Sequence, residues 1–178
     1  MGGRTGMGKK SIKENKNIYQ KSREALDLTR EKAADLLEFI SDDRIEKIES
    51  EKSYPHPDEI VAMAKAYKNP SLCNYYCANE CPIGKATRVP QLQLKELSTI
   101  VLEILNSLDR MDDEKSKFIN IAVDGKITDD EITDFAKIKR ELDKISVSVS
   151  SLKLWINQTI ADGRIDIEKL SAAEKELK

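Results

Sequence analysis

Apolar positions in the N-terminal half of the chain recur at the spacing of short amphipathic helices. The pattern predicts helices over residues 18–26, 30–37, 41–49, 58–67 and 71–79. Thr29 and Ser41 stand where the second and third of these begin, and hydroxyl side chains there cap the first-turn N–H groups. The side chains expected on the buried face of the fourth helix are Ile60, Val61, Ala64 and Tyr67. Because short helices bury apolar faces against one another, the pattern predicts a small helical domain.

The C-terminal half has a different pattern, in which apolar residues step alternately by four and by three. One such run lies within residues 97–122 and the other within residues 135–159. A repeat of this length gives a narrow apolar seam of the coiled-coil kind. We therefore expect two long antiparallel helices, each of roughly 30 residues, or about 45 Å at about 1.5 Å per residue. Lys115 interrupts the first seam and predicts a break near residues 112–113.

Polar turns separate and end these two long helices. Residues 124–126 interrupt the two runs, and Thr128 with Glu131 forms a capping box for the helix that follows. Gly163 ends the second helix, because glycine readily takes the left-handed conformation found there. Residues 166–178 are expected to form a short terminal helix or a frayed tail.

Composition narrows the class of protein. Charged residues make up 35% of the chain and hydrophobic residues 39%, a balance that fits neither a membrane protein nor a disordered one. No run approaches the roughly 20 apolar residues that span a bilayer, and no apolar signal region opens the chain. The three cysteines are an odd number, which does not make a disulfide framework. We expect a soluble cytoplasmic protein with no membrane partner.

Cys73, Cys77 and Cys81 follow one another at intervals of four residues and would stack on one helix face. With His56, the only histidine, they are candidate ligands for zinc or an iron–sulfur cluster. The spacing matches none of the common patterns for either group, and buried thiols also pack as small apolar side chains. Structural packing without a cofactor is therefore our interpretation, with metal binding and redox sensing as alternatives.

The sequence shows no pattern of residues typical of an enzyme active site. A single histidine leaves no convincing nucleophile–base pair, and the chain contains neither a Walker A nor a GxGxxG loop. We expect no catalytic residue and no enzyme activity.

A resemblance to a known family lies in residues 28–52, which read LTREKAADLLEFISDDRIEKIESEK. They resemble the helix-turn-helix of the Cro/CI (XRE) family of bacterial and phage regulators, and the similarity covers about residues 18–67. The matching positions are Thr29, Ala34, Ser41, Ile45, Ile48, Glu49 and Lys52, followed by a proline-bearing loop. The segments CANECPIG and VDGKITDDE are similar to the C-terminal halves of a group of Firmicutes helix-turn-helix proteins of unassigned role.

The resemblance implies a five-helix lambda-repressor-like domain. Together with the seam pattern of the C-terminal half, the expected fold is all-α, with this domain followed by a long antiparallel helical hairpin. The resemblance also implies a set of DNA-contacting residues. Arg30 would lie against a phosphate, and Asp42, Asp43 and Lys47 would face bases, with Lys47 able to donate to guanine. Ser41, Arg44 and Lys52 would contact the DNA backbone.

The chain departs from the family pattern in the charge of this segment. Asp42 and Asp43 stand where the family carries neutral or basic donors, and a carboxylate in the major groove accepts only from cytosine N4. Glu38 lengthens the turn between the second and third helices by one residue, and Glu51 stands where the family often has glycine. Residues 28–52 hold five basic and eight acidic residues. The recognition helix is therefore acidic, and phosphates repel acidic side chains.

These features predict a sequence-specific DNA-binding transcriptional regulator that binds double-stranded DNA as a homodimer. A two-helix hairpin cannot bury both sides alone, and either the N-terminal domain or a second copy could cover it. We expect it to pair two copies, with half-sites about 34 Å apart. The expected parts are a flexible basic leader (1–16), the helix-turn-helix domain (17–84), a linker (85–90), the hairpin (91–161) and a terminal short helix or tail (162–178). Two alternatives remain open: a protein-interaction module on the same fold without DNA binding, and a regulator whose cysteines respond to redox state or metal.

Overall fold

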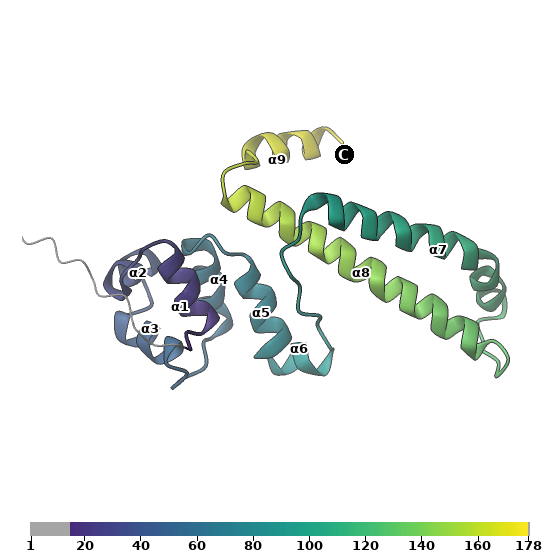
Figure 1. Cartoon of the computed structure of the whole chain (residues 1–178), viewed down its shortest axis with the longest axis horizontal. Coiled ribbons are helices and arrows are strands. Elements are labelled where there is room, and N and C mark those ends of the chain that lie inside the picture. The colour runs from purple at the N-terminus through teal and green to yellow at the C-terminus, as the bar shows by residue number, and fades with distance from the viewer. Residues whose placement is uncertain (1–14, 178) are drawn as a thin grey trace, which may run out of the picture. The chain divides into compact units, whose positions relative to one another are not determined.

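The computed structural model describes residues 15–177, and all regular elements in that part of the chain are helices (Figure 1). The chain divides into two compact units between Gln91 and Leu92. The first unit holds α1 (Ile18–Ala25), α2 (Arg30–Leu37), α3 (Asp42–Glu49), α4 (Pro57–Ala66), α5 (Ser71–Asn79) and α6 (Pro82–Ala86). The second holds α7 (Leu97–Asp124), α8 (Ile132–Ala161) and α9 (Ile167–Glu176). The expectation of an all-α fold is confirmed, while the predicted basic leader lies almost entirely outside the described residues.

Side-chain caps fix the start of each of the first three helices. Asn17 accepts a hydrogen bond from the N–H of Gln20 (3.0 Å) before α1. Thr29 caps α2 in the same way at 3.2 Å, and Ser41 caps α3 at 3.2 Å. Each cap satisfies an N–H group that the helix itself leaves without an acceptor. The two hydroxyl caps expected from the sequence are confirmed.

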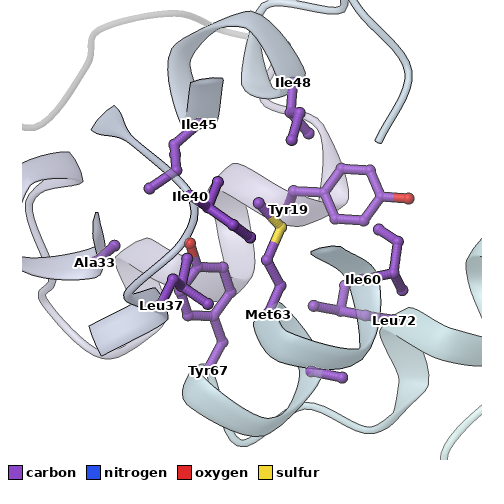
Figure 2. Close-up of a cluster of buried hydrophobic side chains, with 11 residues drawn as sticks. Tyr19, Ala33, Leu37, Ile40, Ile45, Ile48, Ile60, Met63, Tyr67 and Leu72 are labelled. Carbon is purple, nitrogen blue, oxygen red and sulfur yellow. The ribbon is translucent and has the colours of Figure 1, made fainter. Parts of the chain in front are cut away.

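The first unit is built around one apolar core (Figure 2). Its buried side chains come from α1 to α5 and the turn before α3, and they are Tyr19, Ala33, Leu37, Ile40, Ile45, Ile48, Ile60, Met63, Ala64, Tyr67 and Leu72. The expectation that Val61 belongs to the buried face of α4 is wrong, because its side chain is exposed. Ile60 and Tyr67 share a face at helical spacing with Met63, and Val61 lies about 100° away from Ile60.

A short helix replaces the turn and part of the linker expected after α5. Pro82 occupies the first turn of α6, where the missing proline N–H is no loss because no acceptor would be available to it. Gly84 is buried against α5, so closely that a Cβ atom on it would lie 1.8 Å from the carbonyl oxygen of Cys77. The glycine therefore permits the contact between the two helices rather than ending a helix.

The second unit contains the expected hairpin, in which α7 and α8 run antiparallel side by side (Figure 1). The break predicted near residues 112–113 is wrong, because α7 is continuous over 28 residues. Lys115 is 69% exposed and lies 4.0 Å from Asp112, so the seam is open to solvent at this position and the charge leaves the helix intact. Among residues 15–177, no helix is both long enough and apolar enough to cross a membrane.

The connection between α7 and α8 is a polar turn, as expected from the sequence, but the residues that cap α8 differ from the expected ones. Gly125 has a left-handed φ of 66° directly after α7. The Glu131 carboxylate accepts hydrogen bonds from the N–H (3.0 Å) and the hydroxyl (2.6 Å) of Thr128. The prediction that this pair forms a capping box for α8 is wrong, because the helix begins only after Glu131, at Ile132. The hydrogen bonds of the pair instead brace the turn that leads into α8.

The hairpin has two different long faces. Counted from buried Ser107 at about 100° per residue, Val101, Leu105 and Leu108 lie on one side of α7. Arg110 lies on the other side, where charged and polar side chains of both helices line a cavity of about 480 Å³.

The same count on α8, from buried Ser148, places Leu142 and Val149 on the apolar side and Arg140 and Lys144 on the polar side. Because the helices are antiparallel neighbours, the two apolar sides form one continuous surface. We call it the apolar face of the hairpin, formed by Val101, Leu105, Leu108, Leu142 and Val149. All five side chains are more than a third exposed.

Candidate nucleic-acid interface

The position of α3 depends on a buried carboxylate at its C-terminal end. Glu49 is 1% exposed and accepts two hydrogen bonds from Arg23 of α1, at 2.6 and 2.9 Å. It also accepts one from Nε of Arg30, the first residue of α2, at 2.8 Å. One side chain therefore ties α3 to both helices that precede it, and fixes the angle at which α3 is presented.

The ion pair between Arg23 and Glu49 is buried. Burial acts to lower the pKa of Arg23, but the hydrogen bonds and charge of Glu49 outweigh it, and the pKa is raised. Burial and then the charge of Glu49 raise the pKa of Tyr67, whose hydroxyl has no hydrogen-bond partner among the described residues. With a raised pKa, Arg23 stays positively charged and the hydroxyl of Tyr67 stays neutral.

A second ion pair, between Arg44 and Glu59, holds the loop that follows α3. Nε and Nη2 of Arg44 donate to the two carboxylate oxygens of Glu59, both at 2.7 Å. The same guanidinium donates to the hydroxyl of Ser53 and to the carbonyl oxygen of Tyr54. Glu59 in turn accepts from the N–H of His56 at 2.6 Å. Arg44 is thus committed to acceptors of its own chain, a role that the family resemblance did not indicate.

The remaining residues implied by the resemblance lie on or next to α3. Asp42, Asp43 and Lys47 are exposed. Lys52 is 65% exposed and pairs with Glu46 at 3.1 Å. The side chain of Arg30 is 37% exposed, and its bond to Glu49 uses Nε, which leaves the two Nη groups toward the surface. Both cations and carboxylates of α2, α3 and the loop after α3 are therefore accessible to solvent.

The loop after α3 contains a residue whose backbone adopts the left-handed conformation. Glu51 has a φ of 61°, and the carbonyl of Lys47 accepts from the N–H groups of Lys52 (2.9 Å) and Ser53 (3.2 Å). This is the conformation that glycine adopts without steric cost. It explains why the family often has glycine at this position, and it places Lys52 directly after the turn.

The cysteines do not form a shared ligand set. Cys73 and Cys77 lie in α5, whereas Cys81 is the residue before α6. His56 is the residue before α4, and its backbone N–H donates to the Glu59 carboxylate. Within residues 15–177, no three His, Cys, Asp or Glu side chains are grouped so that they would hold a metal ion. Burial, and then the charge of Cys77, raises the pKa of Cys73, which opposes thiolate formation.

Comparison with known proteins gives a match for part of the first unit. Residues 20–71 match the helix-turn-helix family. The match covers α2, α3 and α4 in full, together with the buried acids Glu49 and Glu59 that hold them. No curated protein and no solved structure matches the chain. The helix-turn-helix resemblance of the N-terminal region is confirmed, and the resemblance of the C-terminal half stays a prediction.

Sequence reasoning missed the two acids that organise the helix-turn-helix. It took Glu49 as a family-matching position and as one of the acids of residues 28–52, and it did not single out Glu59, although each has a recognisable position. Glu49 follows Ile45 by four residues, on the core-facing side of α3, and a carboxylate there requires a buried cation. Glu59 stands three residues after His56, the spacing of a capping box.

Proposed function

We propose that this protein is a sequence-specific DNA-binding transcriptional regulator that uses α3 as its recognition helix. The observation that carries the proposal is the exposed outer side of α3, held at a fixed angle by Glu49 inside a segment that matches the helix-turn-helix family. A helix presented in this way fits the major groove of DNA, and its first turns reach the edges of the bases.

Each side chain implied by the resemblance then has its own role in DNA binding. Lys47 donates to guanine O6 and N7, and Asp42 and Asp43 select cytosine N4. The outer nitrogens of Arg30 bind a phosphate near the start of α2. Ser41 and Lys52 contact further phosphates, and these contacts fix the position of the protein along the DNA. Arg44 acts indirectly, because its bonds to Glu59 and Tyr54 shape the loop beside the DNA.

A mobility-shift titration with the full chain tests DNA binding, using fragments that flank its own gene at two salt concentrations. We expect Lys47→Ala to weaken specific binding by about tenfold or more, which corresponds to a lost bidentate base contact of about 1–3 kcal/mol. The control is Lys65→Ala, which removes an equally charged exposed side chain from α4. Equal binding by both variants, or no shift at low salt with flanking or random fragments, would contradict the proposal.

We propose further that two copies pair through the apolar face of the hairpin. Leucine and valine side chains on this face are 38–51% exposed, although the coiled-coil repeat of α7 and α8 is suited to burial. A second hairpin laid against the face completes a four-helix bundle, in which each apolar stripe has two neighbours. Such a pair carries two recognition helices and reads a near-palindromic site.

A further inference from the structure

The end of α2 and the turn after it expose two large apolar side chains. Leu36 is 57% exposed and Phe39 is 62% exposed. Their neighbours Leu37 and Ile40 are buried in the core, so the chain alternates here between inward and outward apolar residues. The outward pair takes no part in the buried core of the module.

The backbone that presents Phe39 is strained. Glu38 has a φ of 58° and a ψ of −49°, and the N–H of Phe39 donates to the carbonyl oxygen of Leu37 at 2.6 Å. This is the uncommon γ-turn with positive φ, which a residue with a side chain adopts at a cost of about 1–3 kcal/mol. The extra residue in the turn and its strain both direct Phe39 outward, and strain of this kind concentrates at functional positions.

Carboxylates flank the two apolar side chains. Glu31, Asp35 and Glu38 follow one another at intervals of four and three residues and are all exposed. In the described part of the chain, no ion pair involves any of the three. We name the group formed by Glu31, Asp35, Leu36, Glu38 and Phe39 the turn surface.

We propose that the turn surface docks a protein segment that carries basic side chains around an apolar one. Charge complementarity determines this choice of partner, because unpaired carboxylates attract lysine and arginine and repel the phosphates of DNA. The exposed Phe39 and Leu36 supply the apolar contact at the centre, where aromatic side chains contribute most to binding. The surface lies beside α3 and does not include it, so the inference does not depend on the proposed DNA contacts.

The test uses the isotope-labelled full-length protein and a synthetic amphipathic peptide of lysine and leucine, followed by amide chemical shifts. We expect shift changes centred on residues 31–39 and an affinity that falls with salt. The double variant Leu36→Ser, Phe39→Ser is expected to weaken binding by about tenfold or more. A matched peptide of glutamate and leucine is expected not to bind.

The control variant is Val61→Ser, which removes a side chain of the same exposure, 62%, from α4. Binding lost equally in this variant, shift changes confined to the hairpin, or equal binding of the glutamate peptide would overturn the proposal. So would a DNA duplex that perturbs residues 31–39 in place of α3, or self-association lost in the double variant. Lys47→Ala separates the two hypotheses, because it should weaken DNA binding and leave peptide binding unchanged.

Discussion

Glu49 and Glu59 sit on the inward sides of α3 and α4, where each accepts hydrogen bonds from an arginine of another helix. A buried carboxylate without a cation is costly, whereas a buried pair with complete hydrogen bonds holds its elements in one arrangement. The surplus of acids in residues 28–52 therefore consists of two groups. Glu49 is structural and faces inward, and only the others shape the charge that a ligand meets.

Low pH should weaken the ion pair between Arg44 and Glu59. Burial acts to raise the pKa of Glu59, but the hydrogen bonds from Arg44 and from the His56 N–H outweigh it, and the pKa lies below its ordinary value of 4.5. A pKa that is lowered in the folded state stabilises the protein above the unfolded value and ceases to do so as the pH falls through the folded value. We therefore expect Glu59→Gln to lower the free energy of unfolding by about 2 kcal/mol at neutral pH and by progressively less below pH 4.5.

Urea denaturation at a series of pH values measures this difference. Arg44→Met is the companion variant, because it removes the cation and leaves the carboxylate. Its stability should depend less on acid over the same range than that of the unaltered protein. A difference between the unaltered protein and Glu59→Gln that stays constant down to pH 3 would show that the charge of Glu59 does not contribute.

At the scale of the helix, local signals predicted most elements. Thr29 and Ser41 marked the starts of α2 and α3 because capping is a property of a few adjacent residues. The start of α6 was missed, since a Pro-Ile-Gly sequence resembles a turn until a neighbouring helix supplies the contact. Lys115 was misjudged in α7 for a similar reason: a charged residue at a seam position breaks a helix only if that position is covered.

The contact between α5 and α6 depends on the absence of a side chain at Gly84. An alanine Cβ would lie 1.8 Å from the carbonyl oxygen of Cys77, and backbone cannot give way as a flexible side chain can. We expect Gly84→Ala to reduce the free energy of unfolding by about 1–3 kcal/mol or to release α6 locally. Urea denaturation and amide hydrogen exchange over residues 82–87 distinguish these results.

Lys85→Ala is the control for Gly84→Ala, because it alters an exposed side chain of the same helix. It should leave both measurements close to those of the unaltered protein. If Gly84→Ala also leaves stability and exchange unchanged, then α6 does not pack on α5 as described.

At the scale of the whole molecule, the two units serve different parts of the proposed function. The first carries residues 20–71, which match the helix-turn-helix family, and the second carries a hairpin with one apolar and one polar long face. The heptad-like pattern predicted the hairpin but not the division of its faces. Residues such as Ser107 and Ser148 occupy the contact between the helices, where small side chains allow close approach, and this displaces leucines from the contact to one side.

Because the hairpin has one apolar and one polar long face, substitutions at two neighbouring residues can test whether two copies pair through the apolar face. Leu105 lies on the apolar face and is 51% exposed, whereas Asn106 lines the polar cavity. Both side chains are at the surface of the single chain, so glutamate at either position should leave the hairpin folded. Leu105→Glu would place a charge inside a four-helix bundle, and we expect it to weaken dimerisation by about tenfold or more. Asn106→Glu should have no such effect.

Sedimentation equilibrium gives the dissociation constant of each variant, and mobility shifts connect it with DNA. If pairing supplies the second recognition helix, Leu105→Glu should weaken binding to a palindromic duplex far more than binding to a single half-site, because only the former requires two linked modules. Monomeric behaviour of the unaltered protein at every concentration would contradict pairing. Loss of the dimer in Asn106→Glu alone would instead place the contact on the polar side, where Arg110 and Arg140 would then need carboxylates of the second copy.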